Sequence, residues 1–203
     1  MHGEERLSSY VPRIAVEWLL ETPNALWREL DGTMAFVDIS GFTQMSERLS
    51  GLGKVGAEEV TEVMNATFSR LLDVAYDFGG GLVKFGGDAL LLFFDGEEHA
   101  GRAAAAAFGM RKALRELGRP QTSAGAVTLK MHVGINSGSF HFFVVGETHR
   151  ELIVTGPGAT RTVQMEAAAE AGEILLSDTA AQALEPRALG AAKGEGPGDR
   201  CRQ

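Results

Sequence analysis

No segment limits the possible folds of this sequence more than residues Val83–Phe94, which read VKFGGDALLLFF. Gly86–Gly87 lies between two apolar runs, which is typical of a two-residue β-hairpin turn because both central residues need positive φ. We predict that Phe85 pairs with Asp88 across this hairpin. In that register Lys84 and Asp88 project from opposite faces of the sheet, so we expect them to serve two different sites. The alternative for Lys84 is a solvated charge at a strand edge.

Asp88 follows the predicted turn and lies among apolar neighbours, as does Asp38 in the run MAFVDISGFT. A carboxylate that stays unpaired in a dry site either costs several kcal/mol or becomes protonated. Two such acids repel each other unless a cation lies between them. Carboxylate oxygens suit a hard divalent ion such as Mg²⁺, which commonly accompanies a phosphate substrate. We therefore predict that Asp38 and Asp88 share a metal site.

The segment Ile39–Thr43 joins a predicted strand, Thr33–Asp38, to a helix that we expect to begin near Gln44. In a strand–loop–helix junction of this kind, free backbone N–H groups and the helix dipole point at an anion. The segment lacks the G-K-[ST] ending of a Walker loop. The alternative is an ordinary helix cap by Ser40 or Thr43, with no role in binding.

Composition excludes several classes of protein. The chain has 203 residues, of which 44% are hydrophobic and 23% charged, as expected for one globular domain. Its formal net charge of −8 argues against nucleic-acid binding. The single cysteine, Cys201, allows no intrachain disulfide. With neither an apolar signal core nor an 18-residue apolar stretch, the sequence predicts a cytoplasmic protein with no membrane association.

The chain divides into three parts: an apolar, partly helical arm over residues 1–30, a domain over residues 31–185, and a polar tail over residues 186–203 that we expect to be disordered or truncated. Asp31–Gly32 predicts a turn, residues 50–56 a glycine-rich linker, and residues 136–138 a second turn. The predicted strands are 33–38, 83–85, 88–94, 128–136, 140–145, 151–155 and 174–176. The predicted helices are 44–49, 58–78, 99–117 and 157–171, with a short one from Ser177. This order indicates an α+β sheet with helices on one face.

Three histidines, His132, His141 and His149, show no metal-ligand spacing and no carboxylate pattern. We interpret each of them as a sheet-face or turn histidine. The sequence also contains no Cys/His cluster and no Ser-His-Asp arrangement.

The motifs FVDISGFT, KFGGDALL and HVGINSG, in this order, resemble the class III nucleotidyl cyclase catalytic domain over about residues 31–180. The segments YVP and TGPGATRTVQMEAAAEAGEILLS are most similar to the first catalytic domain of soluble-type, bicarbonate-responsive adenylyl cyclases. The resemblance implies a ferredoxin-like βαββαβ fold. It also implies the conversion of ATP to cyclic AMP and pyrophosphate at a dimer interface.

By this resemblance Asp38 and Asp88 are the carboxylates that hold two Mg²⁺ or Mn²⁺ ions, with the Ile39 carbonyl as a further ligand. The backbone amides of Ile39, Ser40, Gly41, Phe42 and Thr43 would bind the triphosphate. Lys84 matches the position that reads adenine, and in a metal-bearing half it would face the second, degenerate cleft.

The chain also departs from the family pattern. Ile153 stands where the family has an Asp or Thr that reads adenine, and Thr160 and Gln164 stand where it has the transition-state Asn and Arg. Losing a charged donor at developing phosphate charge costs roughly 10³-fold or more. We therefore expect a dimer, either with a second copy of this chain or, in preference, with a complementary cyclase domain that supplies these groups. The position of the bicarbonate-binding Arg is Val163, with Arg161 two residues away.

Two alternatives stay open at the level of sequence. A catalytically incomplete regulatory or binding domain would account for Thr160 and Gln164, although it has no need of two costly carboxylates. A diguanylate cyclase is suggested by FGGD, but that family places an acid after the Asp, where this chain has Ala89.

Overall fold

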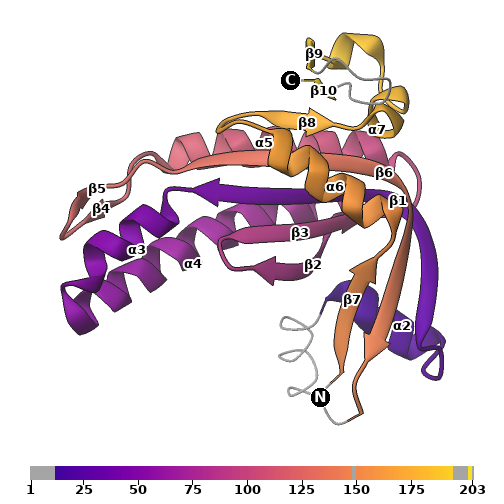
Figure 1. Ribbon diagram of the computed structural model, residues 1–203, viewed down its shortest axis with the longest axis horizontal. Coiled ribbons are helices and arrows are strands. Elements are labelled where there is room, and N and C mark those ends of the chain that lie inside the picture. Colours follow the sequence, from indigo (N-terminus) through magenta and orange to yellow (C-terminus); the bar gives the residue numbers. More distant parts are fainter. Residues whose placement is uncertain (1–11, 148–149, 194–200, 203) are drawn as a thin grey trace.

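The computed structural model describes residues 12–147, 150–193 and 201–202. Figure 1 shows a curled sheet with helices packed against it. The elements in chain order are α2 (Arg13–Glu21), β1 (Trp27–Ser40), α3 (Phe42–Ser50), α4 (Gly53–Asp77), β2 (Gly81–Gly86), β3 (Ala89–Phe94), α5 (His99–Leu117), β4 (Gln121–Thr122), β5 (Gly125–Ala126), β6 (Lys130–Val145), β7 (Glu151–Thr155), α6 (Pro157–Ala168), β8 (Ile174–Leu176), α7 (Asp178–Gln182), the 3₁₀ helix η1 (Pro186–Ala188), β9 (Ala192–Lys193) and β10 (Cys201–Arg202).

The main sheet has the strand order β2-β3-β1-β6-β7, in which all neighbours are antiparallel. A sixth strand, β8, pairs with β6 in parallel. The helices α3 and α4 connect β1 to β2, and α5 connects β3 to the strands that follow it. This confirms the predicted α+β class and its ferredoxin-like order of strands and helices.

Helices lie against both faces of the sheet, whereas the sequence predicted them on one face. The two long helices, α4 and α5, bury the side of β1 that carries Val37 and Ile39. The opposite side carries Met34 and Phe140, and there α2 contributes the buried ring of Trp18. The helix α6 also packs on this second side, where it crosses in front of the sheet in Figure 1 with α5 behind. The second side, with the shorter helices, is the one that carries the candidate site.

The strand β1 begins at Trp27, six residues before the predicted start. Asp31–Gly32 lies inside this strand, so the predicted turn there is wrong. A Cβ atom on Gly32 would lie 2.5 Å from Phe93 Cζ, which explains the glycine by close packing rather than by a turn. The helical part of the predicted arm is α2, and the remainder of the arm up to residue 11 lies outside the described residues.

The strand β6 continues through Asn136–Gly138, so the second predicted turn is also wrong. All 14 residues of β1 pair with β6, which holds this segment in the sheet. Its polar side chains are buried and bonded: Ser137 Oγ lies 2.6 Å from Thr33 Oγ1, and Asn136 Nδ2 donates to the Gly158 carbonyl at 3.1 Å. The polar residues that make this segment look like a turn in the sequence form buried hydrogen bonds within the fold.

The hairpin turn lies one residue later than predicted, so Phe85 pairs with Leu90 instead of Asp88, a register shift of two residues. Gly86 pairs with Ala89, so Gly87 and Asp88 form the turn, and Gly87 alone of the two central residues has positive φ (70°). A glycine with positive φ at the first central position suits a type II′ turn. Asp88 is thus a turn residue and not a strand residue, and the register from which opposite faces were inferred for Lys84 and Asp88 is wrong.

The predicted glycine-rich linker is more ordered than expected. The helix α4 starts at Gly53, so most of the predicted linker over residues 50–56 is helical. Gly56 is buried where α3 crosses α4, and a Cβ atom there would lie 2.0 Å from the Leu49 carbonyl oxygen. In the predicted tail, β9 pairs with β10, and residues 194–200 and 203 lie outside the described part of the chain.

Candidate active site

The two predicted metal ligands lie where β1 ends and β3 begins. Asp38 on β1 is the direct neighbour of Ala89, the first residue of β3. The Ile39 N–H donates to the Asp88 carbonyl at 3.3 Å, so the turn residue Asp88 lies beside the end of β1. Two segments 50 residues apart in sequence therefore bring their acids to one corner of the sheet.

The electrostatics of Asp38 reflect this environment. Its side chain is 25% exposed. Burial raises the pKa of the Asp38 carboxyl, the nearby His132 imidazole lowers it, and the negative charge of Asp88 raises it further. A cation between Asp38 and Asp88 would offset both the burial and the repulsion.

The junction between β1 and α3 consists of one residue, Gly41, with φ of 112°. A Cβ atom at this position would lie 2.6 Å from the Thr128 carbonyl oxygen, so only glycine fits. The helix begins at Phe42, whose ring is buried in the core and which therefore offers only its backbone to a ligand.

No side chain caps the N-terminus of α3. Ser40 Oγ donates to the Lys130 carbonyl at 3.2 Å, and Thr43 Oγ1 donates to Asp88 Oδ2 at 3.5 Å. The alternative of an ordinary cap by Ser40 or Thr43 is therefore wrong. The first N–H groups of α3 have no side-chain acceptor and lie next to the two acids.

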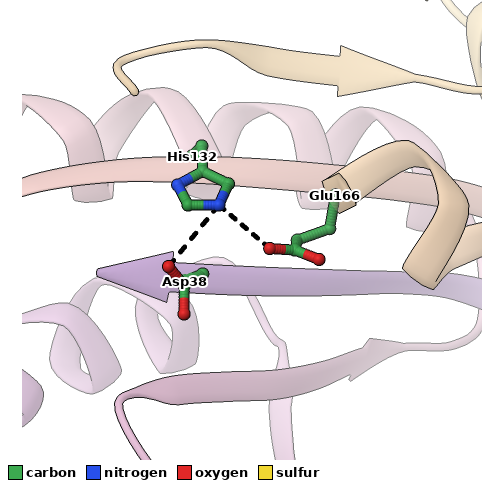
Figure 2. A group of neighbouring side chains, drawn as sticks. All are labelled: Asp38, His132 and Glu166. Atoms are coloured by element: carbon green, nitrogen blue, oxygen red, sulfur yellow. Dashed lines mark ion pairs between the residues drawn. The ribbon is translucent and has the colours of Figure 1, made fainter. Parts of the chain in front are cut away.

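A third acid and a histidine join Asp38, as Figure 2 shows. His132 lies directly opposite Asp38 across β1 and β6. Its Nε2 atom is 2.9 Å from Glu166 Oε1, on α6, and 3.5 Å from Asp38 Oδ2. One ligand atom from each of the three residues lies within 4.8 Å of the others, a spacing at which they could hold a metal ion.

Sequence reasoning missed this group. It placed His132 on a sheet face, which is correct, but did not connect His132 with Asp38 and did not single out Glu166. The available signal was alternation, since Asp38 and His132 both occupy the positions between buried core residues of their strands. The pairing register of β1 with β6, which places the two side chains opposite each other, could not be read from the sequence.

Lys84 lies apart from this group in its contacts. Its Nζ atom forms an ion pair with Glu151 on β7. The strands β2 and β7 are the two ends of the sheet order, so this pair joins the edges of a curled sheet. Lys84 and Asp88 thus have different partners in the structure. This difference does not depend on the hairpin register that the sequence predicted.

The residues that replace family donors are held within this chain. Thr160 Oγ1 donates to the Gly156 carbonyl at 3.2 Å, and Gln164 Oε1 accepts from Arg161 Nη1 at 3.4 Å. Ile153 is partly exposed on β7. Of the four side chains named here, only that of Arg161 carries a charge.

The other histidines fall outside the group. His141 Nε2 lies 3.7 Å from Glu29 Oε1 at an exposed position, and His149 is not among the described residues.

In the described part of the chain, none of the helices combines the length and the apolar character needed to cross a membrane.

Comparisons with known proteins agree on one family. Human adenylate cyclase type 10 is 27% identical over 176 residues, which is 85% of this chain but 11% of that protein. Two solved structures superpose with a TM-score of 0.68: the guanylyl cyclase Cya2, 28% identical over 87% of this chain and 90% of its own, and the adenylyl cyclase CyaB from P. aeruginosa, 25% identical over 88% and 95%.

The present chain thus spans only a small fraction of its curated relatives, and its structural neighbours include both adenylyl and guanylyl cyclases. The model of one family, the adenylate and guanylate cyclase catalytic domain, matches residues 29–195. With the ferredoxin-like sheet and the paired acids at its corner, this match means that the chain belongs to the class III nucleotidyl cyclase catalytic domains.

Proposed function

We propose that this domain is the metal-bearing half of an adenylate cyclase site, in which ATP is converted to 3′,5′-cyclic AMP and pyrophosphate between two cyclase domains. The observation that carries the proposal is the convergence of Asp38 and Asp88 beside the uncapped N-terminus of α3. The choice of ATP is supported by the similarity to adenylate cyclase type 10.

The donor set of the corner fits Mg²⁺ or Mn²⁺. Asp38 and Asp88 offer carboxylate oxygens, and the Ile39 carbonyl is the further predicted ligand. Burial raises the pKa of the Asp38 carboxyl, and the charge of Asp88 adds to this, so a bound cation would favour its ionised form. Two bound ions would lower the pKa of the ribose 3′-hydroxyl and neutralise the charge of the departing pyrophosphate.

The remaining work of this half is binding and orientation. The N–H groups from Ile39 to Thr43, at the positive end of α3, would accept the triphosphate oxygens. The Thr43 hydroxyl, which contacts Asp88, would hold that carboxylate towards the metals. Such contributions act by positioning and by stabilising charge rather than through a dedicated base.

The other half of the site would come from a second domain. Thr160 and Gln164 supply no charged donor and are bonded within α6 and its start. A partner with Asn and Arg at these positions would stabilise the charge of the transition state. Lys84, whose ion-pair partner is Glu151 rather than either aspartate, would serve the second cleft of the dimer.

A second candidate is a regulatory domain that binds nucleotide without turnover. Thr160 and Gln164 favour this candidate, because both form hydrogen bonds within their own chain. A homodimer would therefore lack the Asn and Arg donors at both clefts. Turnover with a complementary domain separates the two candidates.

The test is a cyclisation assay with ATP and GTP, each with Mg²⁺ and with Mn²⁺, on the chain alone and with an added cyclase domain that carries the missing Asn and Arg. We expect roughly 10³-fold more product with the added domain. The product should be cyclic AMP rather than cyclic GMP.

Asp88→Asn should remove the product, whereas Asp31→Asn, at an exposed position on β1, should leave it unchanged. Activity that survives Asp88→Asn would refute the metal assignment. Nucleotide binding without product in either mixture would favour the regulatory domain instead.

A further inference from the structure

The group of Asp38, His132 and Glu166 has a chemistry different from that of the two-aspartate corner. It contains an imidazole nitrogen, and its three members come from β1, β6 and α6 (Figure 2). Magnesium prefers oxygen ligands throughout, whereas a site with nitrogen and carboxylate ligands suits zinc and related transition metals.

Proton counting shows that the group is not satisfied by its own members. His132 Nε2 faces two carboxylates, at 2.9 and 3.5 Å, but a ring nitrogen carries at most one hydrogen. A hydrogen donated to Glu166 leaves Asp38 with an electrostatic contact only. All three side chains are at least three-quarters buried, so their net negative charge is poorly screened by water.

The geometry is close to that of a metal site. Zinc holds nitrogen and oxygen ligands at about 2.0–2.2 Å, so neighbouring ligands of a tetrahedral ion lie about 3.4 Å apart. The two distances from His132 Nε2, 2.9 and 3.5 Å, are on either side of this spacing. Three protein ligands leave one position for water or a phosphate oxygen.

Rigid elements hold the ligands in place. Asp38 and His132 are paired across two central strands. Glu166 is brought over them because Gly134 lacks a side chain: a Cβ atom there would lie 2.1 Å from the Glu166 backbone nitrogen. Because all three ligands lie on strands or a helix rather than on a loop, small movements of their side chains are enough to bind an ion.

We propose that Asp38, His132 and Glu166 form a binding site for a transition-metal ion such as Zn²⁺, distinct from the two-aspartate site but sharing Asp38 with it. Binding at this site occupies Asp38 and therefore competes with the Mg²⁺ that the cyclase reaction needs. This inhibitory consequence rests on the proposed function, whereas the binding itself does not.

The affinity should be limited by the second ring nitrogen. A metal-bound histidine usually donates its other N–H to an acceptor, and His132 Nδ1 is buried with no such partner among the described residues. Second-shell acceptors of this kind change metal affinity by about 10- to 100-fold. We therefore expect binding that is measurable but weaker than that of a structural zinc site.

The test measures metal binding directly on untagged protein, by titration calorimetry with Zn²⁺ and by the visible absorption of bound Co²⁺. His132→Ala and Glu166→Gln should each weaken binding at least tenfold and remove the Co²⁺ spectrum. His141→Ala is the matched control, because His141 lies on the same strand beside a glutamate, and it should change neither signal.

Asp88→Asn separates this proposal from the cyclase assignment. It should abolish cyclisation but keep the Co²⁺ spectrum and weaken Zn²⁺ binding far less than Glu166→Gln does, since Asp88 is not a ligand of the group and acts on it only through its charge. The proposal is overturned if the wild-type protein binds no Zn²⁺, or if Glu166→Gln binds it as tightly as the wild type. Glu166→Gln, which keeps shape and volume, decides the matter if His132→Ala fails to fold.

Discussion

Asp38 works against the stability of the fold that holds it. Because burial and Asp88 raise the pKa of its carboxyl, the ionised form is disfavoured in the folded state. For an acid whose folded pKa is raised, the stabilising contribution is present below the unfolded value, about 3.9, and is lost as pH rises through the folded value. At neutral pH, in the absence of metal, the ionised Asp38 lowers the free energy of unfolding.

Asp38→Asn should therefore raise the free energy of unfolding at pH 7 in buffer with EDTA. The gain should shrink as pH falls through the folded pKa towards about 4, and should be lost below the unfolded value, where the wild-type carboxyl is protonated in both states. Urea denaturation at a series of pH values measures this. Asp31→Asn, at an exposed position of the same strand, should show no comparable gain. A variant less stable than the wild type at pH 7 would contradict the assigned burial of the charge.

At the scale of the element, the hairpin shows how one glycine sets the position of an acid. Only Gly87 of the two adjacent glycines has positive φ, and nothing lies within 4 Å of its Cβ position. The turn therefore places Asp88 at its second central position, beside the end of β1.

Gly87→Ala should cost about 1–2 kcal/mol of unfolding free energy, because an L-residue is strained at this backbone conformation. Gly86→Ala should cost less, since Gly86 lies in the extended strand and its Cβ would meet its nearest neighbours at 3.9 Å. Chemical denaturation of the two variants gives the comparison. Equal costs, or a larger cost at Gly86, would favour the Gly86–Gly87 turn expected from the sequence.

The contact of α6 with β6 is the second element that positions the site. A Cβ atom on Gly134 would clash with the backbone of α6, at 2.1 Å from Glu166 N and 2.6 Å from the Thr162 carbonyl oxygen. Backbone atoms cannot move aside as a flexible side chain can, so the whole helix would have to shift.

We expect Gly134→Ala to destabilise the protein by about 1–3 kcal/mol, as overpacking of a core does, and to move Glu166 away from His132. Denaturation measures the first effect and Co²⁺ absorption the second. Gly81→Ala serves as the control, because its Cβ would meet only the Phe93 carbonyl oxygen, at 3.9 Å. Unchanged stability of Gly134→Ala would mean that α6 does not lie this close to the strand.

At the scale of the whole molecule, the N-terminal helix α2 completes the side of the sheet opposite the long helices. Its Trp18 is 1% exposed, and the indole N–H donates to the Ala25 carbonyl at 2.9 Å. The guanidinium of Arg28 lies 5.3 Å from the centre of the ring. The helix is thus packed as part of the described fold.

Trp18→Ala should lower the free energy of unfolding by about 3–5 kcal/mol, as expected for the loss of a buried aromatic ring. Trp27→Ala is the matched comparison, because Trp27 is 58% exposed, and it should cost much less. Equilibrium denaturation followed by far-UV circular dichroism suits both variants. Similar stability of the two would show that α2 is dispensable for the fold.

Much of this molecule follows from local sequence alone. The helix His99–Leu117, the strands Glu151–Thr155 and Ile174–Leu176 and the Ser177 cap of α7 lie where periodicity and capping place them. These signals are local, since they depend on the spacing of apolar residues and on hydrogen bonds within a few residues. The motifs around Asp38 and Asp88 were likewise sufficient to predict the family.

Tertiary structure decided what local signals misread. Gly32, Gly56 and the Asn136–Gly138 segment look like turns or linkers, yet each is required by close packing or by buried hydrogen bonds between distant segments. The group of His132 and Glu166 with Asp38 depends on the pairing of β1 with β6 and on the contact of α6 with Gly134. Register and helix packing join residues far apart in the chain, so the physical reason for these features lies in contacts that no local pattern of residues contains.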